Sequence, residues 1–325
     1  MNAEQSFRTL PDLAVRSLGG SVVWANDESF AERQHLIVDH PPRFDPAAFG
    51  PRGKIYDGWE TRRRREFGHD TAIVRLGVPG VIRGVVVDTR WFIGNYPPEA
   101  SVEATALDGN PSIPRLLDDA GWTTLLRRKK IHGDTENAFA IDSSDRWTHV
   151  RLSIYPDGGV ARFRVHGEPI PDRSTLGGVD LAALENGGLV VDCSDMFYGS
   201  PNNLISPGVP ASMADGWETA RRRDCGSDWV VIKLGLPGTS SVVELDTSYF
   251  VHNAPGWASV RGCALGAESS IADADWRELL PRTRLQPDTR HRFPVTGTDV
   301  LTHLRLDIYP DGGMARLRLY GRPDR

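Results

Sequence analysis

The sequence predicts an all-β protein built from two tandem jelly-roll β-sandwich domains, and three observations support this fold class. First, the chain has 325 residues, which exceeds the usual domain size of about 100 to 200 residues. Second, long segments of its first half return in its second half. Third, apolar and polar residues alternate with a period of two, and 33 glycines and 23 prolines are available for the turns between strands.

The duplication is clearest in two segments. Asp57–Thr61 (Asp-Gly-Trp-Glu-Thr) is repeated at Asp215–Thr219, 158 residues later. Thr148–Arg164 matches Thr302–Arg318 at thirteen of seventeen positions. Two copies of about 150 residues indicate a duplicated domain and not a solenoid of short repeats.

The segment between the copies predicts a linker. Gly167–Ser174 contains two prolines and several polar residues, which suit an exposed connection. We therefore place the first domain at residues 14–168 and the second domain at residues 183–325. Short helical signals are confined to Val179–Glu185 and Trp276–Leu280.

Strands are expected in two hairpins per domain. In the first domain, Thr71–Leu76 would turn at Gly77–Gly80 and pair with Val81–Asp88. Thr148–Tyr155 and Val160–His166 alternate in the same way on either side of Pro156–Gly159, a sequence typical of a tight turn. The second domain repeats both patterns.

The composition is that of an ordinary soluble globular protein. Hydrophobic residues make up 39% of the chain and charged residues 25%, with a net charge of −5. No apolar run approaches the roughly 20 residues that cross a bilayer, and Met1–Leu10 lacks the pattern of a secretion signal. The three cysteines include no close pair that would suit a disulfide framework or a zinc knuckle. We expect a cytoplasmic protein with no nucleic-acid or membrane partner, no cofactor and no metal.

The segment after Asp57 is the first candidate site. Asp57 and Glu60 are two carboxylates three residues apart, and Arg63 and Arg64 follow them closely. Arginine offers a planar pair of donors to a carboxylate, so this segment could bind a small anion with help from Trp59. The alternative is a structural corner, in which the tryptophan fills the sandwich and Glu60 pairs with an arginine.

A second group of candidates follows an apolar strand run. Asp88 ends that run, and Asn95 lies seven residues later. A carboxylate and an amide at the rim of a β-sandwich would suit hydrogen bonding to a ligand that has both donors and acceptors. The alternative for both residues is a turn held by their own side chains.

His149 and Arg151 are candidates on a strand. Alternation places both on the polar face of their strand, and histidine can serve as acid or base near neutral pH. The alternative is a solvated or interface histidine. Arg151 is a further candidate for substrate binding.

Taken together, these motifs resemble the allantoicase family. The resemblance rests on Asp57–Arg64, Leu76-Gly77, Asp88-Thr89, Gly94-Asn95 and the two Ile-Tyr-Pro-Asp-Gly-Gly stretches, and it extends from about Leu18 to Gly321. It implies a pair of jelly-roll repeats similar to galactose-binding domains, hydrolysis of allantoate to ureidoglycolate and urea, and assembly into homo-oligomers. In the second copy Ala220 replaces Arg62, so we expect the first repeat to contribute more to the site.

The reaction needs an acid and a base, because urea leaves with a proton and water must be activated. For one role we expect Glu60 or Asp57, and for the other Asp88 or His149. The substrate carboxylate would bind Arg63 or Arg64, and a ureido arm would bind Asn95. Two alternatives stay open: a carbohydrate-binding protein without catalysis, and a hydrolase of a related ureide such as ureidoglycolate.

Overall fold

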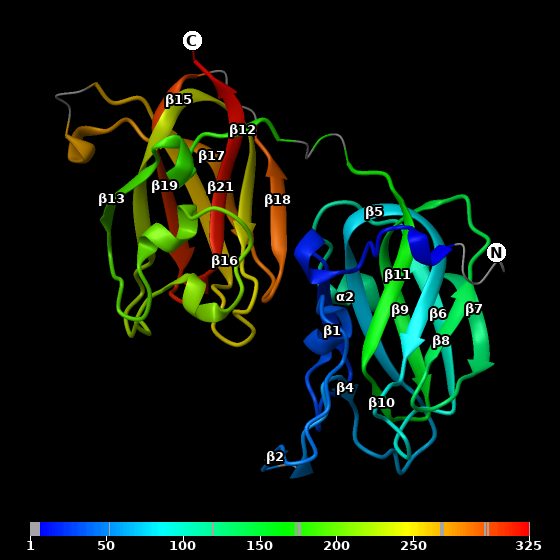
Figure 1. Ribbon diagram of the computed structural model, residues 1–325. Helices are drawn as coiled ribbons and strands as arrows, with labels where there is room; N and C mark the ends of the chain where they lie inside the picture. Colours follow the sequence, from blue (N-terminus) through cyan, green and yellow to red (C-terminus); the bar gives the residue numbers. More distant parts are fainter. Residues whose placement is uncertain are drawn as a thin grey trace. The chain divides into compact units, whose positions relative to one another are not determined.

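The computed structural model describes residues 7–51, 53–118, 120–172, 174, 177–266, 270–295, 297 and 299–324. It divides into two compact units, Met1–Asp172 and Arg173–Arg325, and each is a β-sandwich (Figure 1). The prediction of an all-β fold with two tandem sandwiches is confirmed. Arg173 of the expected linker and Arg325, the expected end of the second domain, lie outside the described residues. The limits 14–168 and 183–325 stay predictions.

The first repeat packs two antiparallel sheets that share one long strand, β5 (Asp70–Asp88), of 19 residues. The first half of β5 lies between β1 (Ser21–Ala25) and β9 (Arg146–Tyr155). That sheet continues from β9 through β6 (Glu99–Thr105) to β7 (Thr123–Lys130). The second half of β5 lies between β8 (Glu136–Ala140) and β11 (Arg162–Pro169).

Both expected hairpins are wrong. Thr71–Asp88 is a single strand that bends near Gly77–Gly80, where its register against β9 jumps from Arg75 to Gly80. Figure 1 shows β5 arching over one end of the first repeat. The strands β9 and β11, which flank Pro156–Gly159, pair with opposite halves of β5 and so lie in different sheets. Alternation shows which residues face inward, but it does not show which strand lies alongside.

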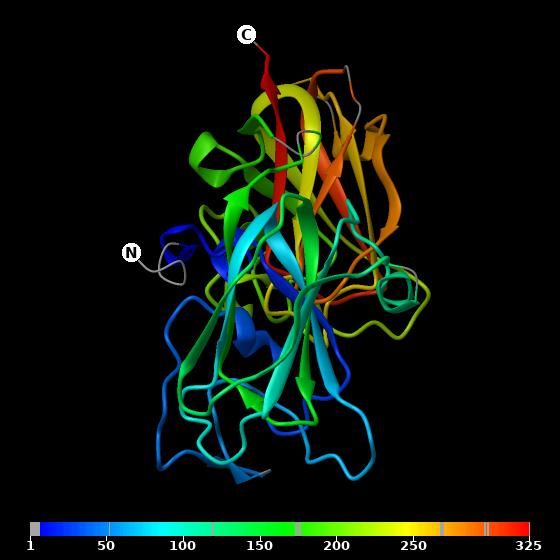
Figure 2. The same ribbon diagram turned by 90° about the vertical axis from the view of Figure 1, so that its right-hand side faces the viewer.

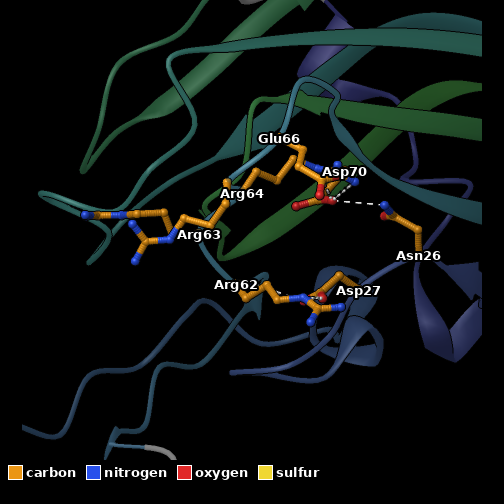
Figure 3. Close-up of a pocket in the computed structure, with 8 residues that line it drawn as sticks. Asn26, Asp27, Arg62, Arg63, Arg64, Glu66 and Asp70 are labelled. Carbon is orange, nitrogen blue, oxygen red and sulfur yellow. Dashed lines mark hydrogen bonds and ion pairs between the residues drawn. The ribbon is translucent and has the colours of Figure 1, made fainter.

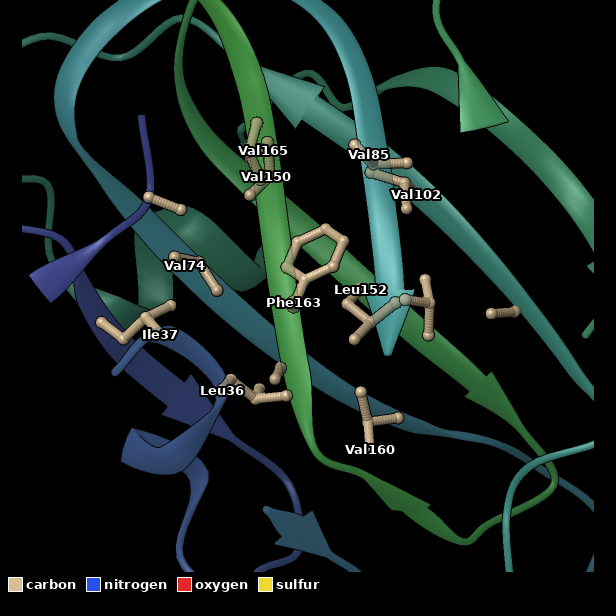
Figure 4. Close-up of a cluster of buried hydrophobic side chains, with 14 of the residues drawn as sticks. Leu36, Ile37, Val74, Val85, Val102, Val150, Leu152, Val160, Phe163 and Val165 are labelled. Atoms are coloured by element: carbon tan, nitrogen blue, oxygen red, sulfur yellow. The ribbon is translucent and has the colours of Figure 1, made fainter. Parts of the chain in front are cut away.

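The core of the first repeat fills the space between its two sheets. Val74, Val85, Leu152 and Phe163 belong to one cluster of buried side chains in this space and have no exposed surface (Figure 4). Trp59 joins the same cluster from a short strand, β4 (Trp59–Glu60). Complete burial of such a side chain contributes about 1.5–3 kcal/mol, so the core stabilises the loops attached to it.

Short elements close the first sandwich. They are the helix α2 (Ile113–Asp118), the strands β2 (Phe49–Gly50), β3 (Gly53–Lys54) and β10 (Gly159–Val160), and the 3₁₀ turns Phe7–Thr9, Arg16–Leu18 and Arg33–Ile37. The expectation did not include α2, whose Leu116 packs on Ile73 on the outer face of the first sheet.

The second repeat has the same topology. Its long shared strand is β15 (Asp228–Asp246), and the other elements follow in the same order. They are the strands β12 (Val179–Asp180), β13 (Leu189–Cys193), β14 (Trp217–Glu218), β16 (Trp257–Cys263), β17 (Arg277–Arg284), β18 (Arg290–Pro294), β19 (Leu301–Tyr309), β20 (Gly313–Met314) and β21 (Arg316–Pro323), with 3₁₀ turns at Leu184–Asn186, Pro201–Ile205, Met213–Asp215 and Ile271–Asp273.

The two expected helices of the second repeat are wrong. Val179–Glu185 begins as strand β12 and ends at a 3₁₀ turn, and Trp276–Leu280 runs into strand β17. Segments of five to seven residues are too short for a helical period to be distinguished from strand alternation. No helix in the described part of the chain is long and apolar enough to cross a membrane.

Candidate functional site

Four segments of the first repeat meet where β5 both begins and ends. Glu60 pairs with Ala31 and with Gly159, and the backbone N–H of Gly159 donates to the carbonyl of Asn95 (2.8 Å). These contacts join residues 26–31, 57–69, 88–97 and 155–160 at one end of the sandwich, the lower end of this repeat in Figures 1 and 2. We call it the loop end. Loops held by a rigid sandwich are common places for binding residues.

Glu60 and Asn95 are in contact at the loop end. The side-chain amide of Asn95 donates to Oε1 of Glu60 (2.7 Å). Burial raises the pKa of Glu60, and the hydrogen bond from Asn95 opposes this only in part. A carboxyl group with a raised pKa is protonated more often near neutral pH, which suits a proton donor. The structure therefore brings together two residues that the sequence predicted separately.

Trp59 faces the opposite way from Glu60. Its side chain has no exposed surface, and its Nε1–H donates to the carbonyl of Asp27 (2.7 Å). No part of the ring is accessible to a ligand. We therefore interpret Trp59 as a core residue that anchors the loop end, which was the structural alternative.

A cavity of about 380 Å³ lies beside this corner and is lined mainly by charged side chains. The lining residues are Asn26, Asp27, Arg62, Arg63, Arg64, Arg65, Glu66 and Asp70. Two of the arginines are already paired, Arg62 with Asp27 (2.7 Å) and Arg64 with Asp70 (2.9 Å). We call this cavity the arginine cavity.

Arg63, like Arg65, is a lining arginine whose charge is not neutralised by an ion pair with a described residue. Its side chain is exposed and forms no ion pair with any residue that the structure describes. Figure 3 shows Arg64 directed to Asp70 and Arg62 to Asp27, whereas Arg63 extends away from both carboxylates. The backbone N–H of Arg64 also donates to Asp157 (2.8 Å), so Arg64 holds the loop in place. Of the two predicted substrate-binding arginines, Arg63 fits a ligand better.

Asp57 is held by a buried arginine. Nη2 of Arg162 donates to Oδ2 of Asp57 (2.7 Å), as does the backbone N–H of Arg43 (2.8 Å). Burial by itself would raise the pKa of Asp57, but these two hydrogen bonds, together with the charges of Arg162 and His35, outweigh it and the pKa is lowered. The carboxylate therefore stays ionised and joins the segment to β11, which indicates a structural role.

Asp88 is also paired. Its side chain is 2% exposed and accepts hydrogen bonds from Nε and Nη2 of Arg90 (2.9 and 2.6 Å). The same guanidinium reaches Glu136 (2.9 Å). Asp88 lies at the loop end and, like Glu60, Asn95 and His69, does not line the arginine cavity.

The expectation that His149 lies on a polar face is wrong. Its side chain is 1% exposed, and burial, together with the charge of Arg75, lowers its pKa to about 3. His149 pairs with Arg75 on β5, five residues along the strand from Asp70, which corresponds to roughly 17 Å. It is therefore separated from the loop end, and a group with so low a pKa is a weak base.

Arg151 is neutralised by a neighbouring strand. Its Nε donates to Glu103 (2.7 Å), and its guanidinium lies over the ring of Trp122 (4.5 Å). Both contacts fix the side chain on the outer face of the first sheet, and the charge of Glu103 offsets its own.

The sequence analysis missed His69. Its ring lies against Tyr155, with the centroids 4.9 Å apart, and it precedes Asp70 of the arginine cavity. Partial burial lowers its pKa, and the charges of Arg64 and Arg151 lower it further. A neutral imidazole near neutral pH can accept a proton. The available signal was its place in the arginine segment, where the second repeat has Ser227.

The second repeat reproduces the framework of this site. Glu218 accepts a hydrogen bond from Asn253 (2.7 Å), which matches the Glu60–Asn95 contact. Ala220 and Ser227, however, replace Arg62 and His69. The shared contacts therefore build the corner in both repeats, and the differences concern the residues around the arginine cavity. Within the described ranges, no three His, Cys, Asp or Glu side chains gather in a way that could hold a metal ion.

Comparisons with known proteins place this architecture in a family. A family model described as the allantoicase repeat matches residues 11–170 and 179–324. A "Probable allantoicase" of Nocardia farcinica is 58% identical over 323 residues, which cover 98% of this chain and 96% of that protein. A "Probable allantoicase" of Streptomyces coelicolor is 49% identical over 336 residues, covering 98% and 87%. A solved structure of allantoicase from Saccharomyces cerevisiae is 33% identical, covers 99% of this chain and 98% of that chain, and has a TM-score of 0.46.

Proposed function

The chain belongs to the allantoicase family, whose reaction is the hydrolysis of allantoate to ureidoglycolate and urea, and we propose that the loop end of the first repeat carries this reaction. The observation that supports this placement best is the juxtaposition of two features. Glu60 is a partly buried carboxyl group with a raised pKa, and Arg63, three residues later, is exposed and forms no ion pair with a described residue. A proton donor and an anion receptor are what the substrate requires.

The chemistry follows from the substrate. Allantoate carries one carboxylate and two ureido groups on a single carbon. Release of urea breaks the bond between that carbon and one ureido nitrogen, and the leaving nitrogen takes up a proton. The lone pair of the other ureido nitrogen helps to expel it, and water then adds to the carbon and loses a proton to a base. The sum is allantoate plus water giving ureidoglycolate plus urea.

We assign the roles by protonation state and availability. Glu60 donates the proton to the leaving urea, and Asn95 holds its carboxyl group in place. Arg63 binds the substrate carboxylate, because its guanidinium is exposed and unpaired among the described residues. His69 accepts the proton from water, because its lowered pKa keeps it neutral. Of the earlier alternatives for the base, Asp88 is held by Arg90 and His149 is buried.

The decisive experiment compares Glu60→Gln with Glu218→Gln. Each variant removes one carboxyl group that accepts a 2.7 Å hydrogen bond from an asparagine, so their structural effects are matched. We expect Glu60→Gln to lower kcat for urea release about 10²-fold or more, the usual contribution of a general acid, and Glu218→Gln to leave it within about twofold. Near-normal turnover in folded Glu60→Gln would remove Glu60 from the mechanism, and the reverse pattern would move the site to the second repeat.

The substrate side is tested with Arg63→Gln and its equivalent in the second repeat, Arg221→Gln. Loss of a charge-assisted contact to the substrate carboxylate should raise KM for allantoate about tenfold in the first variant and leave the second unchanged. Ureidoglycolate and simple sugars serve as alternative ligands in the same assay. Equal KM values in the two variants would contradict a role for Arg63.

The rate of the wild-type chain should depend on pH in a bell shape. It should fall at high pH, as Glu60 loses its proton above its raised pKa, and at low pH, as His69 gains a proton below its lowered pKa. In His69→Ser, which has the residue of the second repeat, the acid limb of the kcat/KM profile should disappear. An acid limb that persists unchanged would exclude His69 as the base. The cytoplasmic location and the homo-oligomeric state stay predictions.

A further inference from the structure

The second repeat has a cavity of its own, about 330 Å³ in volume, on the outer face of the sheet that contains β21. Its lining combines guanidinium and carboxylate groups with one phenol. The lining residues are Asp180, Glu185, Gly208, Val209, Glu244, Asp246, Arg290, Arg316, Arg318 and Tyr320. We call it the β21 cavity. None of these residues has a role in the function proposed above.

Arg316 at the start of β21 is the equivalent of Arg162 in the first repeat. Both residues are buried, Arg316 with 6% and Arg162 with 1% exposure, and each guanidinium donates to three backbone carbonyls at matching positions. For Arg162 the carbonyls belong to His40, Asp57 and Ala161 (3.0, 3.0 and 2.6 Å). For Arg316 they belong to Gly208, Asp215 and Ala315 (3.4, 2.6 and 2.8 Å).

The two arginines differ in their carboxylate partner. Nη2 of Arg162 donates to Oδ2 of Asp57 at 2.7 Å. In the second repeat the equivalent carboxylate, that of Asp215, accepts instead from the backbone N–H groups of Ala211 and Ser212 (2.8 and 3.0 Å). Among the residues that the structure describes, no carboxylate oxygen lies within 4.0 Å of the Arg316 guanidinium. The three carbonyls are neutral and no carboxylate of the described residues is in contact with this buried guanidinium, so an incoming carboxylate would be stabilised here.

Substitutions around Arg316 also open the space beside it. Gly208 stands where the first repeat has His40, so the cavity lacks that imidazole ring. Pro207 stands where the first repeat has Asp39, whose charge acts on the equivalent of Arg318. At this place the second repeat therefore lacks the imidazole of His40, the carboxylate of Asp39 and the arginine–carboxylate contact of the first repeat.

Arg318 adds a second incompletely satisfied cation. It lies two residues from Arg316, so both side chains project from the same face of β21. Nη1 of Arg318 is buried without a hydrogen bond, and the nearest carboxylate oxygen, Oδ2 of Asp180, is 3.6 Å away. Burial and the charge of Arg318 lower the pKa of Arg316 by more than the charges of Asp246 and Asp215 raise it. Nearby carboxylates therefore compensate the charges of Arg316 and Arg318 less than those of the equivalent arginines in the first repeat.

The remaining lining excludes a purely anionic ligand. The carboxylates of Asp180, Glu185, Glu244 and Asp246 line the cavity. Arg290 lies 3.7 Å from Glu244 and 3.9 Å from Asp246, but the four carboxylates outnumber the three lining arginines and would repel an ion such as sulfate. Carboxylates accept hydrogen bonds but donate none, so a ligand that reaches them needs N–H groups. The combination fits a small molecule with one carboxylate and one or more N–H donors.

We propose that the β21 cavity binds a small carboxylate that also bears amide or ureido N–H groups, with its carboxylate on Arg316 in the position that the Asp57 carboxylate occupies in the first repeat. The N–H groups face the acidic side of the cavity. This site is separate from the residues assigned to catalysis, and its existence does not depend on the proposed function.

Titration calorimetry on the full chain tests the proposal. N-carbamoylglycine, which has one carboxylate and one ureido group, is the probe, and acetate, urea and sulfate are compared with it. We expect N-carbamoylglycine to bind more tightly than any of the three. Arg316→Gln should weaken it at least tenfold, whereas Arg221→Gln, an exposed arginine of the same repeat, should leave the affinity unchanged.

A second variant keeps Arg316 intact. Val209→Asp, at the exposed rim of the cavity, adds a carboxylate to the chain and should also weaken the probe at least tenfold while the circular dichroism spectrum stays that of the wild type. Wild-type affinity in folded Arg316→Gln or in Val209→Asp would overturn the proposal, as would the absence of binding to the wild-type chain. If Arg63→Gln abolishes binding and Arg316→Gln does not, the probe occupies the first repeat and the proposal is equally wrong.

Discussion

Replacing His149 by glutamine should remove a large part of the acid sensitivity of the first repeat. The pKa of the buried imidazole is about 3, against an ordinary value of 6.5. Between these values the unfolded chain binds a proton that the folded chain does not, so the free energy of unfolding decreases as the pH falls. One pH unit corresponds to about 1.4 kcal/mol, which gives a loss of about 3 kcal/mol between pH of about 7.5 and about 4.5. That is a substantial share of a typical domain stability of about 5–15 kcal/mol.

The assay is urea unfolding of wild type and His149→Gln at both pH values and constant ionic strength. At the higher pH the variant should be less stable by about 1–2 kcal/mol, because packing around the side chain is disturbed. At the lower pH the difference should shrink or reverse, since glutamine takes up no proton. His303→Gln is the matched control: it has the same 2.9 Å contact with the preceding threonine, but its side chain is partly exposed.

The free energy of unfolding should change less with pH in this comparison. His303 is only partly buried, so its pKa is lowered less than that of His149. A stability difference between wild type and His149→Gln that does not vary with pH would refute the argument. Because His149 lies far from the loop end, the variant should also release urea at a near-normal rate at neutral pH. A large loss of turnover in the folded variant would restore it as a catalytic candidate.

Two further predictions concern the scaffold of the loop end. Asp57→Asn leaves a buried arginine without its carboxylate and should lower the free energy of unfolding by about 2 kcal/mol. This is below the range for fully buried pairs, because the Asp57 side chain is 20% exposed. Asp215→Asn should lower it less in the same denaturation experiment, and equal losses would contradict the difference between the repeats. Gly159→Ala would place a Cβ atom 2.0 Å from the ring of Phe92, so it should destabilise the fold by about 1–3 kcal/mol. In Gly94→Ala the new Cβ atom meets nothing within 4 Å, so this variant should be close to the wild type in stability. Similar thermal midpoints for the two variants would contradict the expected clash with Phe92.

Much of the site could be predicted because residues that occur in the same register in both repeats form the same local contacts. The same residues in the same register produced the same contact twice, Glu60 with Asn95 and Glu218 with Asn253, each at 2.7 Å. Period-two alternation likewise identified β strands, since the side chains of a strand face opposite sides by covalent geometry. The family, the two sandwiches and the acidic corner therefore follow from the order of residues along the chain.

Other features depend on what lies beside a residue in space. The sequence alternates around Gly77–Gly80 as a hairpin would, yet the chain bends there into a second sheet, because strand pairing is decided by non-local contacts. His149 looks polar by position but is 1% exposed.

The clearest case is the pair of equivalent arginines. Arg162 and Arg316 occupy the same position in two similar sequences. Tertiary structure decides that one meets the carboxylate of Asp57 while the other faces a cavity. Desolvation and charge compensation act over a few ångströms of space, and residues from several distant segments supply them.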